Sequence, residues 1–407
     1  MKRGTQIFTM LALIGLLVTA GPVFAKGQYD TGATDTEIKL GDIHPLSGPA
    51  SGYGIIGIGN KAYFQMVNDK GGINGRKINY NLVDDAYSPP KTVEQARRLV
   101  EKEQVLLIFQ SLGTPCNTAI YEYMNAKKVP QLFISSGASK WGANPTKYPW
   151  TMGFEPTYLA EGVIYAEYIM KNVPDPKIGI LYQNDDYGKD YLNGLKIGLG
   201  DKAKDLIVSE LSYEAGDPTV DSQIISLKNS GANVFYNVTI PKYAAMAVRQ
   251  VYDIGWRPLH LLNHVSASVG TVLKPAGFEK SVGVISAGWI KDPKDPQWQN
   301  DADFKAWDAW MDKYLPQGSK DDAFCVASYV FSYSMHQVLK MCGDNLTRKN
   351  VIKQATSLKD LEVPMLLPGI KVNTSPTDYY PVEQYQLMRF DGKNWVLFGK
   401  VMDARAK

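Results

Sequence analysis

The sequence predicts an α/β protein made of two similar lobes, each with a parallel sheet covered by helices on both faces. Short runs rich in β-branched and aromatic residues alternate with amphipathic helical segments, as expected for β-α-β units. This alternation starts twice, near residue 37 and again near residue 177. Two successive series favour two sheets over one large sheet, because consecutive elements usually pack next to each other.

Each lobe has its own set of expected elements. In the first lobe, the hydrophobic periodicity predicts helices over residues 60–72 and 91–103, and strands over residues 37–43, 77–85, 105–111 and 130–136. In the second lobe, it predicts helices over residues 219–231 and 243–255, and strands over residues 177–184, 206–213, 232–238, 260–265 and 282–289.

The last hundred residues break this rhythm. Residues 303–315 form an amphipathic segment whose apolar face we expect to pack inside the protein, with a ligand-facing aromatic stripe as the alternative. Further helices are expected over residues 325–342 and 347–358, and a hairpin over residues 384–401. Helices without interleaved strands can only complete a lobe already begun, so we expect the chain to return late to its first lobe.

The chain begins with a segment typical of secretory signal peptides. Lys2 and Arg3 precede a mostly apolar run, and residues 23–25 place small side chains where a signal peptidase reads them. The run is shorter than the ~20 residues of a spanning helix, so an uncleaved membrane anchor is the less favoured alternative. We therefore predict a signal peptide over residues 1–25 and a mature protein in the periplasm, where Lys26 offers no site for a lipid.

The net charge bears on the expected partners, and the positions of the cysteines bear on whether disulfides stabilise the fold. The formal net charge is +3, and removal of Lys2 and Arg3 leaves about +1 without any long basic tract, so nucleic acid is not an expected partner. Cys325 and Cys342 lie at the ends of one predicted helix, about 25 Å apart, which is too far for a disulfide. We expect these two cysteines and Cys116 to be buried free thiols.

A glycine-rich stretch over residues 52–57 matches the G-x-G-x-x-G pattern of dinucleotide-binding turns. That turn requires its first glycine directly after a strand, whereas here the strand ends near Ile43 and eight residues intervene. A nucleotide cofactor is therefore not expected. The stretch instead predicts a flexible loop that brings Tyr53 and backbone N–H groups close to a ligand.

Other signals of catalysis are weak, and we predict no catalytic residue, no metal and no cofactor. The chain has no G-x-S-x-G, H-E-x-x-H or P-loop motif. His260 and His264 are four residues apart in a predicted strand, about 13 Å, which is too far for shared zinc ligation. The acid pairs at residues 84–85 and 185–186 follow strands and precede helices, where capping explains them.

Small hydroxyl-bearing clusters follow two strands of the first lobe, over residues 110–117 and 134–139. Ligands of open α/β sheets bind just beyond the carboxyl ends of the strands, and hydroxyls beside helix N-termini suit a carboxylate. Plain helix capping is the alternative for each single Ser or Thr. Two clusters in one lobe, together with Tyr53, favour a binding site.

At this point the sequence resembles the periplasmic binding proteins of the branched-chain amino acid (leucine/isoleucine/valine) type, which are solute receptors of ABC importers. The resemblance covers nearly the whole mature chain. It is carried by IKLGDIHPLSGPASGYG, by FQMVNDKGGINGRKINYNLVDDAYSPPKTVEQARRLV, and by PQLFISSGAS and IGILYQNDDYGKD in the same order. The second lobe, with DIGWRP, is similar in style to members that bind aromatic acids.

The resemblance implies a type I periplasmic binding protein fold, with two Rossmann-like lobes joined by three hinge crossovers. These crossovers should lie near residues 151–155, 287–290 and 380–384. The implied N-terminal lobe comprises residues 26–152 and 289–381. The implied C-terminal lobe comprises residues 153–288 and 382–407.

The resemblance also implies a set of ligand contacts. Thr114 and Ser139 occupy the hydroxyl positions that grip the ligand carboxylate, and Tyr53 matches the aromatic residue after the Ser-Gly-Pro turn. The remaining implied contacts are Gly113, Ser136, Gly137 and Ala138 in the first lobe, and Tyr187, Asn237, Thr239, His264 and Val265 in the second.

One departure from the family pattern bears on the ligand. Where amino-acid receptors place an acid that pairs with the ligand ammonium, this chain has Val265, and an unpaired buried ammonium costs several kcal/mol. The family disulfide is also missing, because Tyr87 stands where its first cysteine would be. We therefore expect a carboxylate such as a benzoate or a phenylpropanoid. Branched-chain or other amino acids are the alternative, for which Glu155 or Asp185 could supply the ammonium contact.

The expected function is that of a non-enzymatic, monomeric receptor that captures a small carboxylate and delivers it to the permease and ATPase subunits of an ABC importer. A secreted hydrolase is disfavoured, because no nucleophile and base can be nominated. A receptor that docks on a signalling protein instead has the same sequence features. Transport and sensing therefore both stay open.

Overall fold

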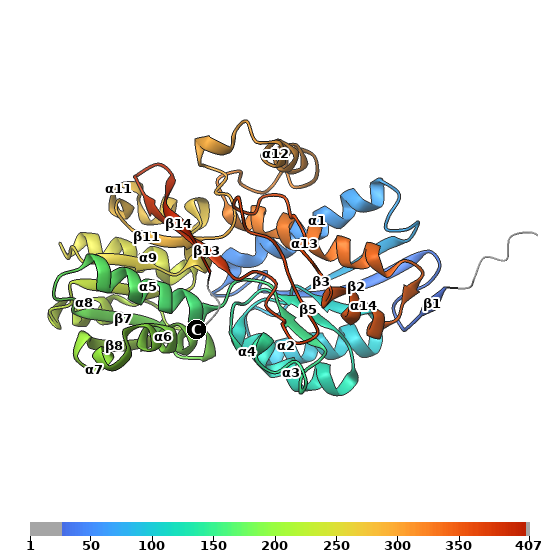
Figure 1. The fold of residues 1–407 in the computed structure, drawn as a ribbon, viewed down its shortest axis with the longest axis horizontal. Coiled ribbons are helices and arrows are strands. Elements are labelled where there is room, and N and C mark those ends of the chain that lie inside the picture. Colours follow the sequence, from blue (N-terminus) through green and yellow to red (C-terminus); the bar gives the residue numbers. More distant parts are fainter. Residues whose placement is uncertain (1–26, 404–407) are drawn as a thin grey trace, which may run out of the picture.

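Two separate sheets form the centres of two lobes that lie next to each other along the longest axis of the molecule (Figure 1). The structure is a computed structural model that describes residues 27–403. The predicted signal peptide over residues 1–25 lies outside the described residues. Within the described part, no helix is long and apolar enough to cross a membrane.

The first sheet is entirely parallel and has five strands. Its inner strands are buried on both faces, as expected for a parallel sheet covered by helices. Across the sheet, the strands are β3 (Lys77–Asp84), β2 (Glu37–His44), β4 (Leu107–Phe109), β5 (Gln131–Ile134) and β6 (Thr151–Gly153). A separate parallel pair joins β1 (Gln28–Tyr29) to β12 (Asn345–Leu346).

Helices from two distant parts of the sequence cover the first sheet. The long α13 packs beside α1 although more than 250 residues separate them in sequence (Figure 1). The chain therefore returns late to its first lobe, as the sequence predicts. The helices of this lobe are α1 (Gly54–Asp69), α2 (Pro89–Arg97), α3 (Thr114–Lys127), α4 (Lys140–Ala143), α12 (Ala302–Tyr314), α13 (Ala323–Cys342) and α14 (Arg348–Ala355).

The second sheet has seven strands, five of them parallel. The last two strands form an antiparallel hairpin that pairs with β11, because the connection around Asp391 is too short for a parallel crossover. Across the sheet, the strands are β14 (Trp395–Asp403), β13 (Gln384–Phe390), β11 (Ile285–Gly288), β10 (Leu259–Leu262), β9 (Val234–Val238), β7 (Ile178–Gln183) and β8 (Ile207–Tyr213).

The helices of the second lobe alternate with its strands in sequence, starting with α5 before β7. The pair α5 and α6 packs tightly, since Gly162 and Gly194 leave room for close backbone approach. The helices are α5 (Tyr158–Asn172), α6 (Asp186–Leu199), α7 (Ala203–Leu206), α8 (Asp221–Asn229), α9 (Pro241–Asp253), α10 (Lys274–Ala276) and α11 (Phe278–Ser281).

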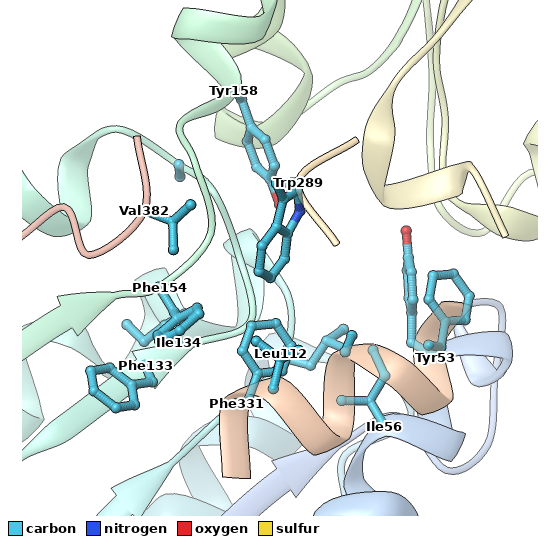
Figure 2. Packing of buried hydrophobic residues seen from close by; sticks show 14 of the residues in the cluster. Tyr53, Ile56, Leu112, Phe133, Ile134, Phe154, Tyr158, Trp289, Phe331 and Val382 are labelled. Carbon is cyan, nitrogen blue, oxygen red and sulfur yellow. The ribbon is translucent and has the colours of Figure 1, made fainter. Parts of the chain in front are cut away.

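Residues from the three connections between the sheets are buried together (Figure 2). Phe154 follows β6, Trp289 follows β11, and Val382 precedes β13. The ring of Phe154 lies 5.2 Å from that of Phe331 on α13 and 6.1 Å from that of Trp289. These contacts hold the connections against one helix. The exact domain boundaries stay a prediction.

The sequence-based expectations of fold class hold, with two local errors. The glycine-rich stretch over residues 52–57 is not a flexible loop, because Ser51–Tyr53 form a 3₁₀ turn and α1 begins at Gly54. The strand predicted over residues 260–265 ends at Leu262, and His264 instead begins a short 3₁₀ turn, His264–Ser266. The pairing of β10 with β9 ends at Leu262, opposite Asn237, so the chain is free to turn after this residue. Residues Cys116, Cys325 and Cys342 are buried free thiols, as predicted.

Candidate functional site: the cleft between the lobes

A cavity of about 880 Å³, part of it continuous with solvent, lies where the carboxyl ends of both sheets face each other. Residues that follow strand ends line it from both lobes, as expected for open α/β sheets. Each of six lining residues comes after a different strand: Thr114 after β4, Ser135 after β5, Glu155 after β6, Tyr187 after β7, His264 after β10 and Trp289 after β11.

Thr114 is the first residue of α3 and lines the cavity. The turn before it requires glycine, because Gly113 has a φ of +98° and an added Cβ would meet the Tyr87 ring at 2.5 Å. Pro115 follows at a helix position that needs no N–H donor. The first turn of α3 thus starts at the cavity wall, where its unpaired N–H groups favour an anion.

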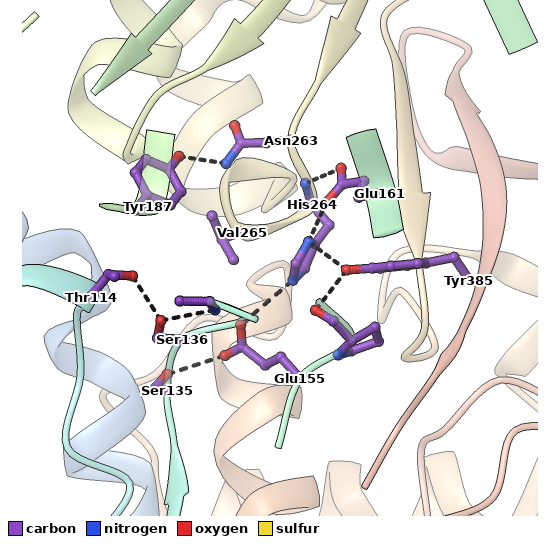
Figure 3. Close-up of polar contacts among 12 residues, drawn as sticks. Thr114, Ser135, Ser136, Glu155, Glu161, Tyr187, Asn263, His264, Val265 and Tyr385 are labelled. Atoms are coloured by element: carbon purple, nitrogen blue, oxygen red, sulfur yellow. Dashed lines mark hydrogen bonds and ion pairs between the residues drawn. The ribbon is translucent and has the colours of Figure 1, made fainter. Parts of the chain in front are cut away.

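The hydroxyl of Thr114 is set up to donate a hydrogen bond into the cavity. It lies 2.7 Å from the Ser136 hydroxyl, which already accepts from the Trp141 indole at 2.9 Å and from the Ala138 N–H at 3.3 Å. With both acceptor sites used, Ser136 donates its own proton to Thr114. Among the described residues the Thr114 proton has no other acceptor, so it is left for a ligand oxygen (Figure 3).

Two tyrosines of the cavity, Tyr53 and Tyr187, present their rings, because their hydroxyls donate to protein. Tyr53 donates to the carbonyl of Val265 at 3.0 Å. Tyr187 donates to the amide oxygen of Asn263 at 2.7 Å when that amide is oriented to satisfy all its partners. Eight aromatic side chains line the cavity: Tyr53, Tyr87, Tyr158, Tyr187, Trp289, Phe324, Phe331 and Trp395.

A charged cluster faces the cavity around His264 (Figure 3). Its Nδ1 contacts the fully buried Glu161 carboxylate at 2.5 Å, and its Nε2 lies 3.6 Å from Oε2 of Glu155. Burial alone would lower the pKa of His264, but the charges of Glu161 and Glu155 outweigh it and raise the pKa to about 9. The imidazole is therefore protonated at neutral pH, and two carboxylates share one positive charge.

A third acid, Asp292, lies in the lining near the second connection between the lobes. One oxygen accepts from the backbone N–H of Lys294 at 2.7 Å, and the other has no hydrogen-bond partner. Burial raises the pKa of Asp292 to about 7. No Lys or Arg is among the described residues of the lining, and the protonated His264 already faces the carboxylates of Glu161 and Glu155. Away from His264, the lining offers a ligand carboxylate neutral donors such as the Thr114 hydroxyl.

Half of the predicted contacts line the cavity and half do not. Six of the twelve are in the lining: Tyr53, Gly113, Thr114, Tyr187, His264 and Val265.

The other six lie outside the lining. Ser136 contacts the Thr114 hydroxyl, the Asn237 side chain bonds to His260, and the Thr239 hydroxyl bonds to Asn237. Ser139 donates through its N–H and hydroxyl to Asp190 of the second lobe, each at 2.8 Å. Gly137 and Ala138 lie in the same turn outside the lining, and the binding role of all twelve stays a prediction.

Several lining residues have no counterpart among the predicted contacts. Glu155 was weighed only as a possible ammonium partner, whereas Trp289, Asp292 and Phe331 carried no signal, since they lie far from the recognised motifs in sequence. Their place in the lining depends on how the second connection and α13 pack. In the part of the chain that the structure describes, no group of His, Cys, Asp and Glu could hold a metal ion.

Comparison with known proteins places the chain in a family. Residues 37–394 match the family described as "Periplasmic binding protein", and the chain belongs to this family. Its class is that of a periplasmic solute-binding protein with two parallel-sheet lobes, and it is a binding protein rather than an enzyme.

Individual relatives are distant. A Leu/Ile/Val-binding protein homolog 1 from Brucella abortus is 24% identical over 83% of this chain and 85% of that protein. A fatty acid ABC transporter substrate-binding protein from Thermomonospora curvata is 22% identical and covers 93% of this chain and 95% of its own, with a TM-score of 0.78. A branched chain amino acid ABC transporter protein from Thermus thermophilus with bound valine is 14% identical, covering 93% and 97%, with a TM-score of 0.79.

Proposed function

We propose that this protein is the solute receptor of an ABC importer, and that it captures a small aromatic carboxylate in the cleft and delivers it to the permease. The relatives described as ABC transporter components support the transport role. The predicted signal peptide supports a periplasmic location. The ligand class rests on the cleft itself.

The observation that carries the ligand class is that the lining combines the donors at Thr114 with eight aromatic side chains. Thr114 and the first turn of α3 offer O–H and N–H donors without a positive side chain, which suits one carboxylate. The eight rings offer faces and edges for a planar apolar body. Val265, where an amino-acid receptor would have an acid, adds apolar surface.

An amino acid is the second candidate, and Glu155 favours it. Oε2 of Glu155 has no hydrogen-bond partner, and the cluster of Glu155, Glu161 and His264 has a net charge of −1 when the imidazole is protonated. An ammonium group would be attracted to this charge. The neighbouring imidazolium opposes that attraction, which is why the carboxylate without an amino group is preferred.

The test compares ligands that differ only in the ammonium group. Thermal stability of the mature protein is measured with phenylpropionate against phenylalanine, and with 4-methylpentanoate against leucine. We expect phenylpropionate to stabilise the protein most, by ~2.7 kcal/mol at a concentration ~100 times its dissociation constant. Stabilisation by leucine or phenylalanine, with none by the two acids, would overturn the proposed ligand class.

A further inference from the structure

We propose that Glu155 and His264 form a second polar anchor that recognises a hydroxyl group on the ligand, so that the preferred ligand is a hydroxylated aromatic acid. This inference rests on the proposed function, since it takes the ligand carboxylate to lie at Thr114. It adds a specificity determinant at a different place in the cavity.

Both members of the pair are buried in the cavity wall with one atom unused. Oε1 of Glu155 accepts from the Ser135 hydroxyl at 3.3 Å, whereas Oε2 has no hydrogen-bond partner among residues 27–403. Nε2 of His264 has none either. The side chains are only 8% and 5% exposed, and Nε2 and Oε2 face each other at 3.6 Å, an ion-pair contact that is too long for a hydrogen bond. Unsatisfied buried polar atoms are rare, and a pair of them in a ligand cavity indicates a ligand group.

The protonation of His264 follows from its other contacts. Glu161 accepts from the His264 backbone N–H at 2.9 Å and from the Tyr191 hydroxyl at 2.8 Å, and its carboxylate also contacts Nδ1. The Glu161 oxygen accepts a hydrogen bond from Nδ1 at this short contact, so Nδ1 carries a proton. The Tyr385 hydroxyl, 3.2 Å from Nδ1, donates to the Pro156 carbonyl and so adds no proton there.

The remaining edge of the imidazole then also carries a proton. The pKa of about 9, which the charges of Glu161 and Glu155 produce against the opposing effect of burial, keeps Nε2 protonated at neutral pH. The pair therefore presents one N–H donor beside one carboxylate acceptor. A ligand group that satisfies both atoms must accept a hydrogen bond from Nε2 of His264 and donate one to Oε2 of Glu155.

A hydroxyl group matches this requirement better than other ligand groups. Its oxygen accepts from Nε2 while its proton goes to Oε2 of Glu155. An ammonium has no acceptor and would leave the imidazolium N–H unbonded beside a second positive charge. An ether or a ketone has no donor for Glu155, and a second carboxylate would be repelled by it. A phenolic hydroxyl on an aromatic acid has both functions.

The test is isothermal titration at neutral pH with a matched ligand series. The series comprises phenylpropionate, its three ring-hydroxylated isomers, the three methoxy counterparts, and phenylalanine. We expect at least one hydroxyl isomer to bind about tenfold more tightly than phenylpropionate, because a hydrogen bond to a charged group is involved. Its methoxy counterpart should show no gain.

The variant Glu155→Gln should reduce this hydroxyl advantage to about threefold or less, because the acceptor loses its charge. Its affinity for phenylpropionate itself should be unchanged or higher, since a like charge has been removed. The matched control is Glu167→Gln, an exposed acid on the same helix as Glu161, which should keep the full advantage. The comparison of hydroxyl with methoxy ligands in the unaltered protein keeps the test decisive even if the variant folds poorly.

Three results would overturn the inference. Phenylpropionate could bind with no gain from any hydroxyl isomer, which would leave the proposed function intact. The hydroxyl advantage could persist in Glu155→Gln. Phenylalanine could bind about tenfold more tightly than phenylpropionate and lose that gain in Glu155→Gln, which would make Glu155 an ammonium partner. Failure of every acid in the series to bind would overturn the proposed function as well.

Discussion

The hydroxyl of Tyr53, in the first lobe, donates a 3.0 Å hydrogen bond to the backbone carbonyl of Val265, in the second. The Tyr53 ring packs against Phe324 at 5.0 Å and also lines the cavity. One side chain thus forms part of the ligand wall and ties the two lobes together. Hinge closure around a ligand explains why such a residue belongs in the 3₁₀ turn Ser51–Tyr53 at the start of α1.

Replacing Tyr53 by Phe keeps the ring and removes the bond to Val265. We expect the affinity for phenylpropionate to fall by about 2- to 10-fold, mostly through faster dissociation, because one neutral hydrogen bond of the closed form is lost. Titration calorimetry and stopped-flow dissociation measure this. Tyr252→Phe, at an exposed tyrosine in α9, is the control that should change nothing. An unchanged dissociation rate in Tyr53→Phe would show that this bond does not hold the lobes closed.

Substitution of Ser139 tests whether its hydroxyl holds the two lobes closed or contacts the ligand directly. The resemblance implies that its hydroxyl grips the ligand carboxylate, whereas in this structure it bonds to Asp190 across the lobes. If it acts as a latch, Ser139→Ala weakens carboxylate and uncharged ligands by the same factor, about threefold to tenfold. X-ray scattering should then also show a larger radius of gyration without ligand. A loss confined to carboxylates would instead support the direct contact.

The fold was predictable because it depends on local patterns. The alternation of apolar runs and amphipathic helices along the chain is visible in sequence, and the late return of α13 follows from helices that have no strands between them. The turn at His264 was missed because no Gly or Pro marks the end of the strand within residues 260–265. Only the pairing of β10, which stops at Leu262, shows where the strand ends.

The site was half predictable for the same reason. Tyr53 and Thr114 lie at the helix starts that come after β2 and β4, so their place at the cavity follows from topology. Ser139 and Thr239 also follow strands, but their hydroxyls turn to protein partners, which sequence does not reveal. Glu155 takes its role from the distant His264, a pairing that depends on how the two lobes meet.

His264 should make stability depend on pH at the alkaline side of neutrality. Its pKa of about 9 in the folded protein exceeds the ordinary value of 6.5, because Glu161 and Glu155 outweigh burial. The stabilisation is complete below pH ~6.5 and is lost as the pH rises through ~9, by about 2–3 kcal/mol. Urea unfolding across this range measures it, and His264→Gln should flatten the slope. An equal slope in this variant would assign the titration to another group.

Asp292 should make the free energy of unfolding depend on pH between about 4 and 7. Burial raises its pKa from 3.8 to about 7, so the folded protein binds more protons than the unfolded chain between these values. The free energy of unfolding therefore falls as the pH rises from ~4 to ~7. Asp292→Asn should be more stable than the unaltered protein by about 1–3 kcal/mol at pH ~8 and no more stable at pH ~4. A variant that is less stable at pH ~8 would contradict this.

The most direct measurement is the affinity for phenylpropionate after the Thr114 hydroxyl is removed. Thr114→Val keeps the shape of the side chain and the first turn of α3, whereas Thr114→Ser keeps the hydroxyl. Titration calorimetry should show that Thr114→Val binds about 10- to 100-fold more weakly, with Thr114→Ser within about threefold of the unaltered protein. Wild-type affinity in Thr114→Val would contradict a carboxylate held at the start of α3.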